Sequence, residues 1–108
     1  MKIFVNKLSS KERNADILQQ YQRFCDFCLM NGFQAAGQDD AEVQVFFPSG
    51  SLSQISTAVA IKESGKKIRI FIVNINKHYE HLLAYLKQTG NDKFVEVKQN
   101  IDEIIKLI

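Results

Sequence analysis

The chain has 108 residues, of which 45% are hydrophobic and 24% charged, with one proline and a formal net charge of +2. This composition is typical of one globular domain and excludes disordered and fibrous proteins. So small a basic excess gives no argument for DNA or RNA binding, and no apolar run approaches the roughly 18 residues of a membrane-spanning helix. We therefore expect a single domain over residues 1–108, without a nucleic-acid or membrane partner.

The first half of the chain alternates between strand-like and helix-like spacing of its apolar residues. Ser9 and Glu12 form a Ser-x-x-Glu capping pattern in front of the helical stretch, and Asn31 and Gly32 would end it. The almost continuously apolar run Val-Gln-Val-Phe-Phe is typical of a strand buried on both faces of a parallel sheet. The expected elements are a strand at residues 3–5, a helix from about 11 to 30, a short strand at 33–36 and a strand at 43–47.

The second half continues the alternation and completes the topology. Its expected elements are a helix from about residue 52 that stops at Gly65, a buried strand at 68–73, a helix capped by Asn76 and closed by Gly90, a strand at 94–97, and a last helix capped by Asn100 and Glu103. Strands that alternate with helices imply right-handed crossovers and a parallel sheet. We predict a small three-layer α/β domain of the Rossmann-like, flavodoxin-like kind, with four or five strands in the order 2-1-3-4-5. The strands at 43–47 and 68–73 should be adjacent and parallel.

In open sheets of this kind, ligands bind beyond the carboxyl ends of the strands, where the strand order reverses. Here that point lies between the first and third strands, and a helix begins there with unpaired N–H groups and a positive dipole end. Gly50 would let the backbone approach a ligand closely, and the serine hydroxyls could donate to phosphate or sugar oxygens. Alternatively, the Pro-Ser-Gly-Ser turn only starts the helix. The candidate contacts at this point are Asn6, Pro48, Ser49, Gly50, Ser51 and Ser53.

Two stretches carry a resemblance to known families. Residues 47–55, Phe-Pro-Ser-Gly-Ser-Leu-Ser-Gln-Ile, resemble a shortened Pro-Gly-Gly-x-Gly-Thr-x-x-Glu loop of LOG-type (lysine decarboxylase-like) nucleotide phosphoribohydrolases. Residues 74–83 resemble the Asn-x-x-x-Tyr-Tyr-x-x-Leu-Leu stretch of the same family, which adds Asn74 as a candidate contact. His78 is a further candidate because it would begin a helix at the ligand end of the sheet.

The N-terminal half is similar to nucleoside 2-deoxyribosyltransferases, through Gly32-Phe33 and a run that starts at Gly50-Ser51 and ends at Gly65-Lys66. Both families act on the N-glycosidic bond of nucleosides or nucleotides, and both commonly assemble as dimers or larger. The two resemblances therefore imply a nucleotide-type ligand and a homo-oligomer.

Gln54 occupies the position at which both families carry their catalytic glutamate. An amide cannot act as a carboxylate nucleophile or a general base, but it can hydrogen-bond a sugar hydroxyl. The first hypothesis is therefore non-catalytic binding of a nucleotide, for sensing or sequestration. The second hypothesis is a divergent N-glycosidase or deoxyribosyltransferase that uses Asp39, Asp40 or Glu42 near the same end of the sheet. The third hypothesis is an interaction module without a ligand.

The remaining features favour neither a metal nor a cofactor. Cys25 and Cys28 form a Cys-x-x-Cys late in a helix, on its apolar stripe, where cysteines act as small buried hydrophobes. His78 and His81 lack a companion carboxylate motif. Two cysteines give no disulfide framework and the first residues are too quickly polar for a signal peptide, so we expect a cytoplasmic protein.

Overall fold

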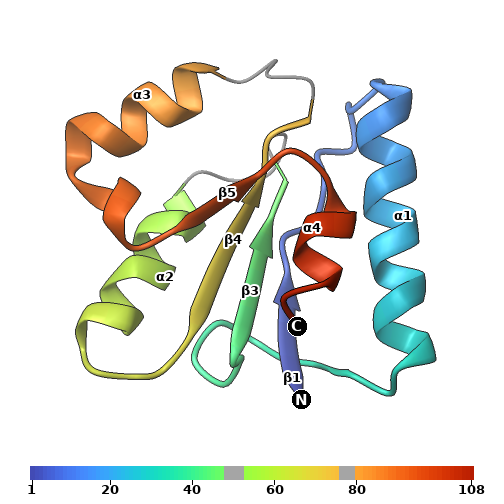
Figure 1. The fold of residues 1–108 in the computed structure, drawn as a ribbon, viewed down its shortest axis with the longest axis horizontal. Helices are drawn as coiled ribbons and strands as arrows, with labels where there is room; N and C mark the ends of the chain where they lie inside the picture. Colours follow the sequence, from blue (N-terminus) through green and yellow to red (C-terminus); the bar gives the residue numbers. More distant parts are fainter. Residues whose placement is uncertain (48–52, 76–79) are drawn as a thin grey trace.

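The strands form one parallel sheet with helices on both of its faces (Figure 1). The computed structural model describes residues 1–47, 53–75 and 80–108 of the chain. Within these ranges the elements are β1 (Lys2–Val5), α1 (Ala15–Met30), β2 (Gln34–Ala35), β3 (Val43–Phe46), α2 (Ser53–Glu63), β4 (Arg69–Val73), α3 (Glu80–Thr89), the 3-10 turn η2 (Asn91–Lys93), β5 (Glu96–Lys98) and α4 (Ile101–Ile105). The strand order is β2-β1-β3-β4-β5 and every pairing is parallel, which confirms the predicted fold.

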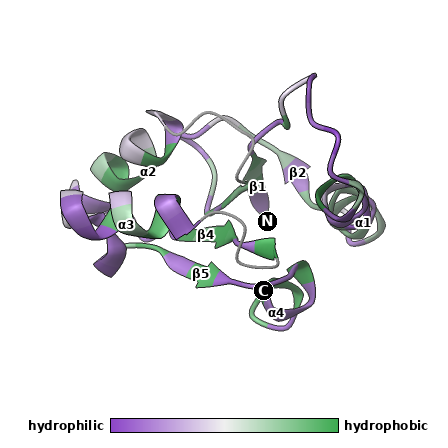
Figure 2. Cartoon of the chain, turned by 90° about the horizontal axis from the view of Figure 1, so that it is seen from above, coloured by the Kyte–Doolittle hydropathy of each residue, from purple (hydrophilic) through white to green (hydrophobic). Residues whose placement is uncertain are grey.

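Alternating residues of the strands divide the core into two clusters, one on each face of the sheet. Val43 and Val45 of β3 pack with α1 and α4, whereas Phe46 packs with α2 and α3. Successive side chains of a strand point to opposite faces, so an apolar strand such as β3 needs a helix layer on each side. Figure 2 shows this arrangement from above, with α2 and α3 on one side of the strands and α4 on the other.

The predicted neighbours β3 and β4 pair in register from Val43 opposite Arg69 to Phe46 opposite Ile72. All four residues of β3 are buried, including the amide of Gln44. The adjacency and parallel direction of these two strands are therefore confirmed.

The start of α1 differs from the prediction. The helix begins at Ala15, and its N-cap is Asn14, whose Oδ1 accepts hydrogen bonds from the backbone N–H groups of Asp16 and Ile17. Ser9 instead closes a turn, with its Oγ accepting from the backbone N–H of Lys11. The prediction that Ser9 and Glu12 cap this helix was wrong. Asn14, which is nearer the apolar stripe, accepts from the free backbone N–H groups at the start of the helix.

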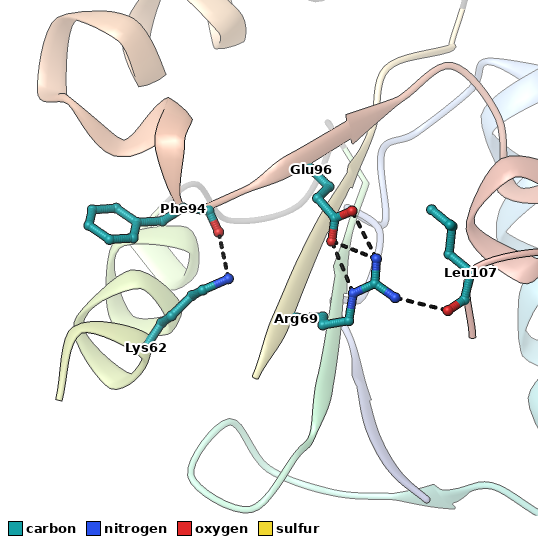
Figure 3. A network of polar contacts seen from close by, with 5 residues as sticks. All are labelled: Lys62, Arg69, Phe94, Glu96 and Leu107. Carbon is teal, nitrogen blue, oxygen red and sulfur yellow. Dashed lines mark hydrogen bonds and ion pairs between the residues drawn. The ribbon is translucent and has the colours of Figure 1, made fainter. Parts of the chain in front are cut away.

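The amino end of β4 is tied to the C-terminal segment (Figure 3). Arg69 donates from Nε and Nη2 to the carboxylate of Glu96 on β5, at 2.9 to 3.1 Å, and from Nη1 to the backbone oxygen of Leu107 at 2.8 Å. Its guanidinium also lies 4.8 Å from the ring centroid of Phe71. The residue thereby holds α4 and the segment that follows it against the sheet.

Candidate functional site

A cavity of about 630 Å³ runs along β1 between α1 and the edge of the sheet. The cavity exists because β2 is only two residues long. The pairing of β1 with β2 ends at Ile3 opposite Ala35, and the next residues of β1, Phe4 and Val5, line the cavity. The described residues that line it are Ile3, Phe4, Val5, Asn6, Lys7, Cys25, Cys28, Leu29, Phe33, Ala35, Ala36 and Gln54. Its volume lies within the range of small-molecule sites. We call it the β1 cavity.

The polar residues of the β1 cavity gather at the carboxyl end of β1. Asn6 is buried, and its backbone N–H donates to Val45 on β3 at 2.9 Å. Lys7 follows it, is exposed, and forms no ion pair with another described residue. The Oε1 of Gln54, in the first turn of α2, is buried and has no hydrogen-bond partner among the described residues. A buried acceptor without a partner costs free energy.

Gln38 holds the backbone oxygen of Gln54 and is itself held by Gln44. The Nε2 of Gln38 donates to the backbone oxygen of Gln54 at 2.8 Å and to the Oε1 of Gln44 at 3.0 Å. The Nε2 of Gln44 donates in return to the backbone oxygen of Gln38 at 2.9 Å. Gln44 is fully buried in β3, so the first turn of α2 is anchored to the centre of the sheet.

The other end of the β1 cavity is apolar and includes two thiols from α1. Burial, reinforced by the neighbouring Cys25, raises the pKa of the Cys28 thiol to about 11. Burial also raises the pKa of Cys25, against a lowering by its hydrogen bond with Tyr21. Both thiols are therefore protonated at neutral pH and act as part of an apolar wall with Leu29 and Phe33.

A different cavity, of about 350 Å³, lies at the carboxyl ends of β4 and β5 beside α3. The described residues that line it are Asn74, Glu80, Leu83, Val97, Lys98 and Gln99. We call it the β4–β5 cavity. Asn74 therefore lies at the predicted edge of the sheet, but it lines this cavity and not the one with Asn6 and Gln54.

The other predicted contacts are distributed unevenly. Asn6 and Gln54 line the β1 cavity together. Ser53 is the exposed first residue of α2 and does not line it. Pro48, Ser49, Gly50, Ser51 and His78 lie outside the described residues. Sequence reasoning missed Lys7 and the apolar wall from α1; the signal for Lys7 was its position directly after Asn6, at the end of the first strand.

The proposed substitute carboxylates do not gather at this site. Glu42 directly precedes β3, its backbone N–H donates to Lys2 O at 3.0 Å, and its Oε1 accepts from the Lys2 backbone N–H at 3.3 Å. Lys2 begins β1, so Glu42 lies at the amino edge of the sheet, opposite the predicted site. Neither Asp39 nor Asp40 lines the β1 cavity. We expected Glu42 at the carboxyl end of the sheet, and this was wrong. The loop after β2 runs back to the start of β3 and carries Glu42 to the amino end.

Among the described residues, no group of three or more His, Cys, Asp or Glu side chains could hold a metal ion. None of the described helices combines the length and the hydrophobicity of a membrane span. Comparisons of the chain with protein-family models, with curated proteins and with solved structures found no match.

Proposed function

We propose that this protein binds a nucleotide or a nucleotide-derived small molecule in the β1 cavity and does not convert it. The observation that carries the proposal is that Gln54 lines the cavity at the carboxyl end of β1 and that its buried Oε1 has no hydrogen-bond partner among the described residues. Sugar hydroxyls and the exocyclic amine of a base are donors that such an oxygen can accept. In this fold, the carboxyl ends of the strands are also the usual ligand edge.

The two ends of the β1 cavity suit the two ends of a nucleotide. Lys7 has no described ionic partner and would neutralise a phosphate at the polar end, beside the amide of Asn6. Phe33, Cys28 and Leu29 would contact the base at the apolar end. The sequence-predicted contacts at Ser49, Gly50 and Ser51 remain part of the proposal as donors to the phosphate, whereas Ser53, which does not line the cavity, does not.

Binding is proposed in place of cleavage because of the chemistry of Gln54. An amide cannot form a glycosyl ester or remove a proton from water. It can hold a sugar in position while leaving the glycosidic bond intact. Such a protein would act by sensing or sequestering its ligand.

We also propose that the rim of this cavity is covered by a second copy of the chain. Leu29 and Met30, at the end of α1, are 78% and 86% exposed. Exposed large apolar side chains beside a cavity mark interaction surfaces. The variant Met30→Glu should lower the molar mass measured by light scattering if this rim forms the interface; an unchanged mass would remove the assembly proposal without affecting the ligand proposal.

The test of binding combines identification with titration. Small molecules released from the purified protein by denaturation are identified by mass spectrometry, and AMP, dAMP and adenosine are titrated by calorimetry. Gln54→Leu should weaken binding about tenfold, since it removes one hydrogen bond to the ligand. Gln88→Leu, an exposed glutamine on α3, is the matched control. Binding that Gln54→Leu leaves unchanged, with the fold intact by thermal melting, would contradict the proposed site.

A further inference from the structure

The edge of β1 that faces β2 loses its partner strand before β1 ends. The pairing of the two strands stops at Ile3 opposite Ala35, whereas β1 continues to Val5. The backbone N–H of Ala36 still donates to the oxygen of Ile3 at 3.0 Å, and no described residue continues the pairing beyond that bond. An open strand edge presents backbone donors and acceptors that another molecule can pair with.

The backbone N–H and C=O of Val5 point to this open edge. Successive residues of a paired strand direct these groups to alternate neighbours. The oxygen of Ile3 is bonded on the β2 side, and the N–H of Asn6 donates to the oxygen of Val45 on the β3 side at 2.9 Å. Val5 therefore shares the direction of Ile3. Among the described residues, no hydrogen bond reaches either backbone group of Val5.

The β1 cavity lies along the same edge. An unbroken run of β1 and the residues after it, from Ile3 to Lys7, lines the cavity. Because successive side chains of a strand point to opposite faces, a cavity that touches such a run lies against the edge of the strand. Val5 is only partly buried. Its free N–H and C=O are therefore open to a molecule in the β1 cavity.

The surroundings of Val5 suit a flat ring in the plane of the sheet. Cys28 of α1 belongs to the core cluster on one face of the sheet, and Gln54 lies in the first turn of α2, which packs on the opposite face. Both residues line the cavity, so a ring that continues the plane of the sheet lies between the two helices. The free edge is short because β1 ends at Val5, which favours a ring over an added peptide strand.

We infer that the backbone of Val5 binds the Watson–Crick edge of the nucleotide base. This inference rests on the proposed function, and it assigns the group that reads the base. The Val5 N–H donates to a ring acceptor, and the Val5 C=O accepts from the donor beside it. In adenine these two atoms are N1 and the N6 amine. Strand backbone, and not a side chain, then selects a base with an adjacent acceptor and donor.

Amide hydrogen exchange tests the inference on the unchanged chain. In the free protein, the Val5 amide should exchange faster than the Asn6 amide, because only the latter is hydrogen-bonded within the sheet. Saturation with AMP should slow exchange at Val5 at least about tenfold. A Val5 amide that is as protected as that of Asn6 in the free protein, or that bound AMP does not protect, would overturn the inference.

Analogues of AMP test the two hydrogen bonds separately. The analogue 1-deaza-AMP lacks the N1 acceptor, and N6,N6-dimethyl-AMP lacks the N6 donor. In calorimetric titration each should bind about tenfold more weakly than AMP, since each loses one hydrogen bond. The matched control is 7-deaza-AMP, which keeps both groups and should bind like AMP. Equal binding of AMP and either of the first two analogues would overturn the inference.

A proline substitution removes the donor from the chain itself. Val5→Pro deletes an N–H that forms no described hydrogen bond, and proline is tolerated at such edge positions of a sheet. It should weaken AMP binding at least about tenfold, whereas Val5→Ala, which keeps the N–H, should bind AMP like the wild type.

Failure of the inference is distinguishable from failure of the proposed function. AMP that binds wild type and Val5→Pro equally would overturn the role of Val5 and leave nucleotide binding in place. Absence of AMP binding to the wild type would overturn both.

Discussion

Gln38 and Gln44 hold each other by two hydrogen bonds, one from each side-chain amide. The first joins Gln38 Nε2 to Gln44 Oε1, and the second joins Gln44 Nε2 to the backbone oxygen of Gln38. Gln44 is fully buried in β3, whereas Gln38 lies in the helix-free connection between β2 and β3. Because Gln38 also donates to the backbone oxygen of Gln54, this pair sets the position of one wall of the β1 cavity.

Removing Gln38 should therefore destabilise the protein as well as the site. Gln38→Ala leaves the buried Gln44 Oε1 without its donor and removes the side-chain donor to the Gln54 backbone oxygen, and we expect the free energy of unfolding to fall by about 1–3 kcal/mol. Urea unfolding of this variant and of Gln19→Ala, an exposed glutamine on α1, gives the comparison. The control should change stability by less than about 0.5 kcal/mol. Equal effects of the two substitutions would show that the glutamine pair does not anchor the loop.

The N-cap of α1 gives a second comparison of two variants. Asn14→Ala should lower the free energy of unfolding by about 0.5–2 kcal/mol, because two helix amides lose their acceptor. Ser9→Ala should have a smaller effect, since Ser9 only closes an exposed turn. Thermal or urea unfolding measures both. A larger loss at Ser9 would restore the capping-box prediction.

The sheet could be predicted from the sequence because each strand has a clear hydrophobic pattern within a few consecutive residues. The buried strands β3 and β4 appear as continuous apolar runs, and the alternation of strands with helices fixes the parallel direction. Element ends were less predictable. Ser9 and Asn14 both have side chains that can cap a helix, and only packing of the apolar stripe selects Asn14.

The candidate site could be predicted only in part. Asn6 follows from the rule that ligands bind beyond the carboxyl ends of strands, and Gln54 from the family resemblance of residues 47–55; both line the β1 cavity. The apolar wall could not be predicted, because it depends on how early β2 ends and therefore on the turn at Gly37, whose oxygen accepts from the backbone N–H groups of Asp40 and Ala41. Asn6 and Asn74 line different cavities, and this depends on tertiary packing, which a local sequence pattern does not contain.

The raised pKa of Cys28 gives a pH dependence with a definite sign. Burial favours the neutral thiol in the folded state, whereas in the unfolded chain the thiol ionises near its ordinary pKa of 9.0. The contribution of Cys28 to stability is therefore full below about pH 9 and is lost as the pH rises toward about 11. Urea unfolding of the wild type and of Cys28→Ala across this range should show their stability difference shrinking as the pH rises. A stability difference that stays constant with pH would mean that the Cys28 thiol is not shielded from water.

The protein should not cleave nucleotides, because Gln54 cannot supply a carboxylate. We expect no release of free base from a panel of ribo- and deoxyribonucleoside monophosphates above the uncatalysed background, as measured by chromatography. Multiple turnovers that disappear on substitution of Asp39, Asp40 or Glu42 would instead identify this protein as an enzyme with a displaced acid.

NMR titration of the ¹⁵N-labelled chain with AMP tests most directly whether the β1 cavity is a nucleotide site. We expect backbone amide signals to shift at Asn6, Lys7, Cys28 and Gln54, which line that cavity, while Lys98 and Gln99 at the other cavity stay unchanged. Shifts confined to Lys98 and Gln99, or no shifts at all at millimolar AMP, would contradict it.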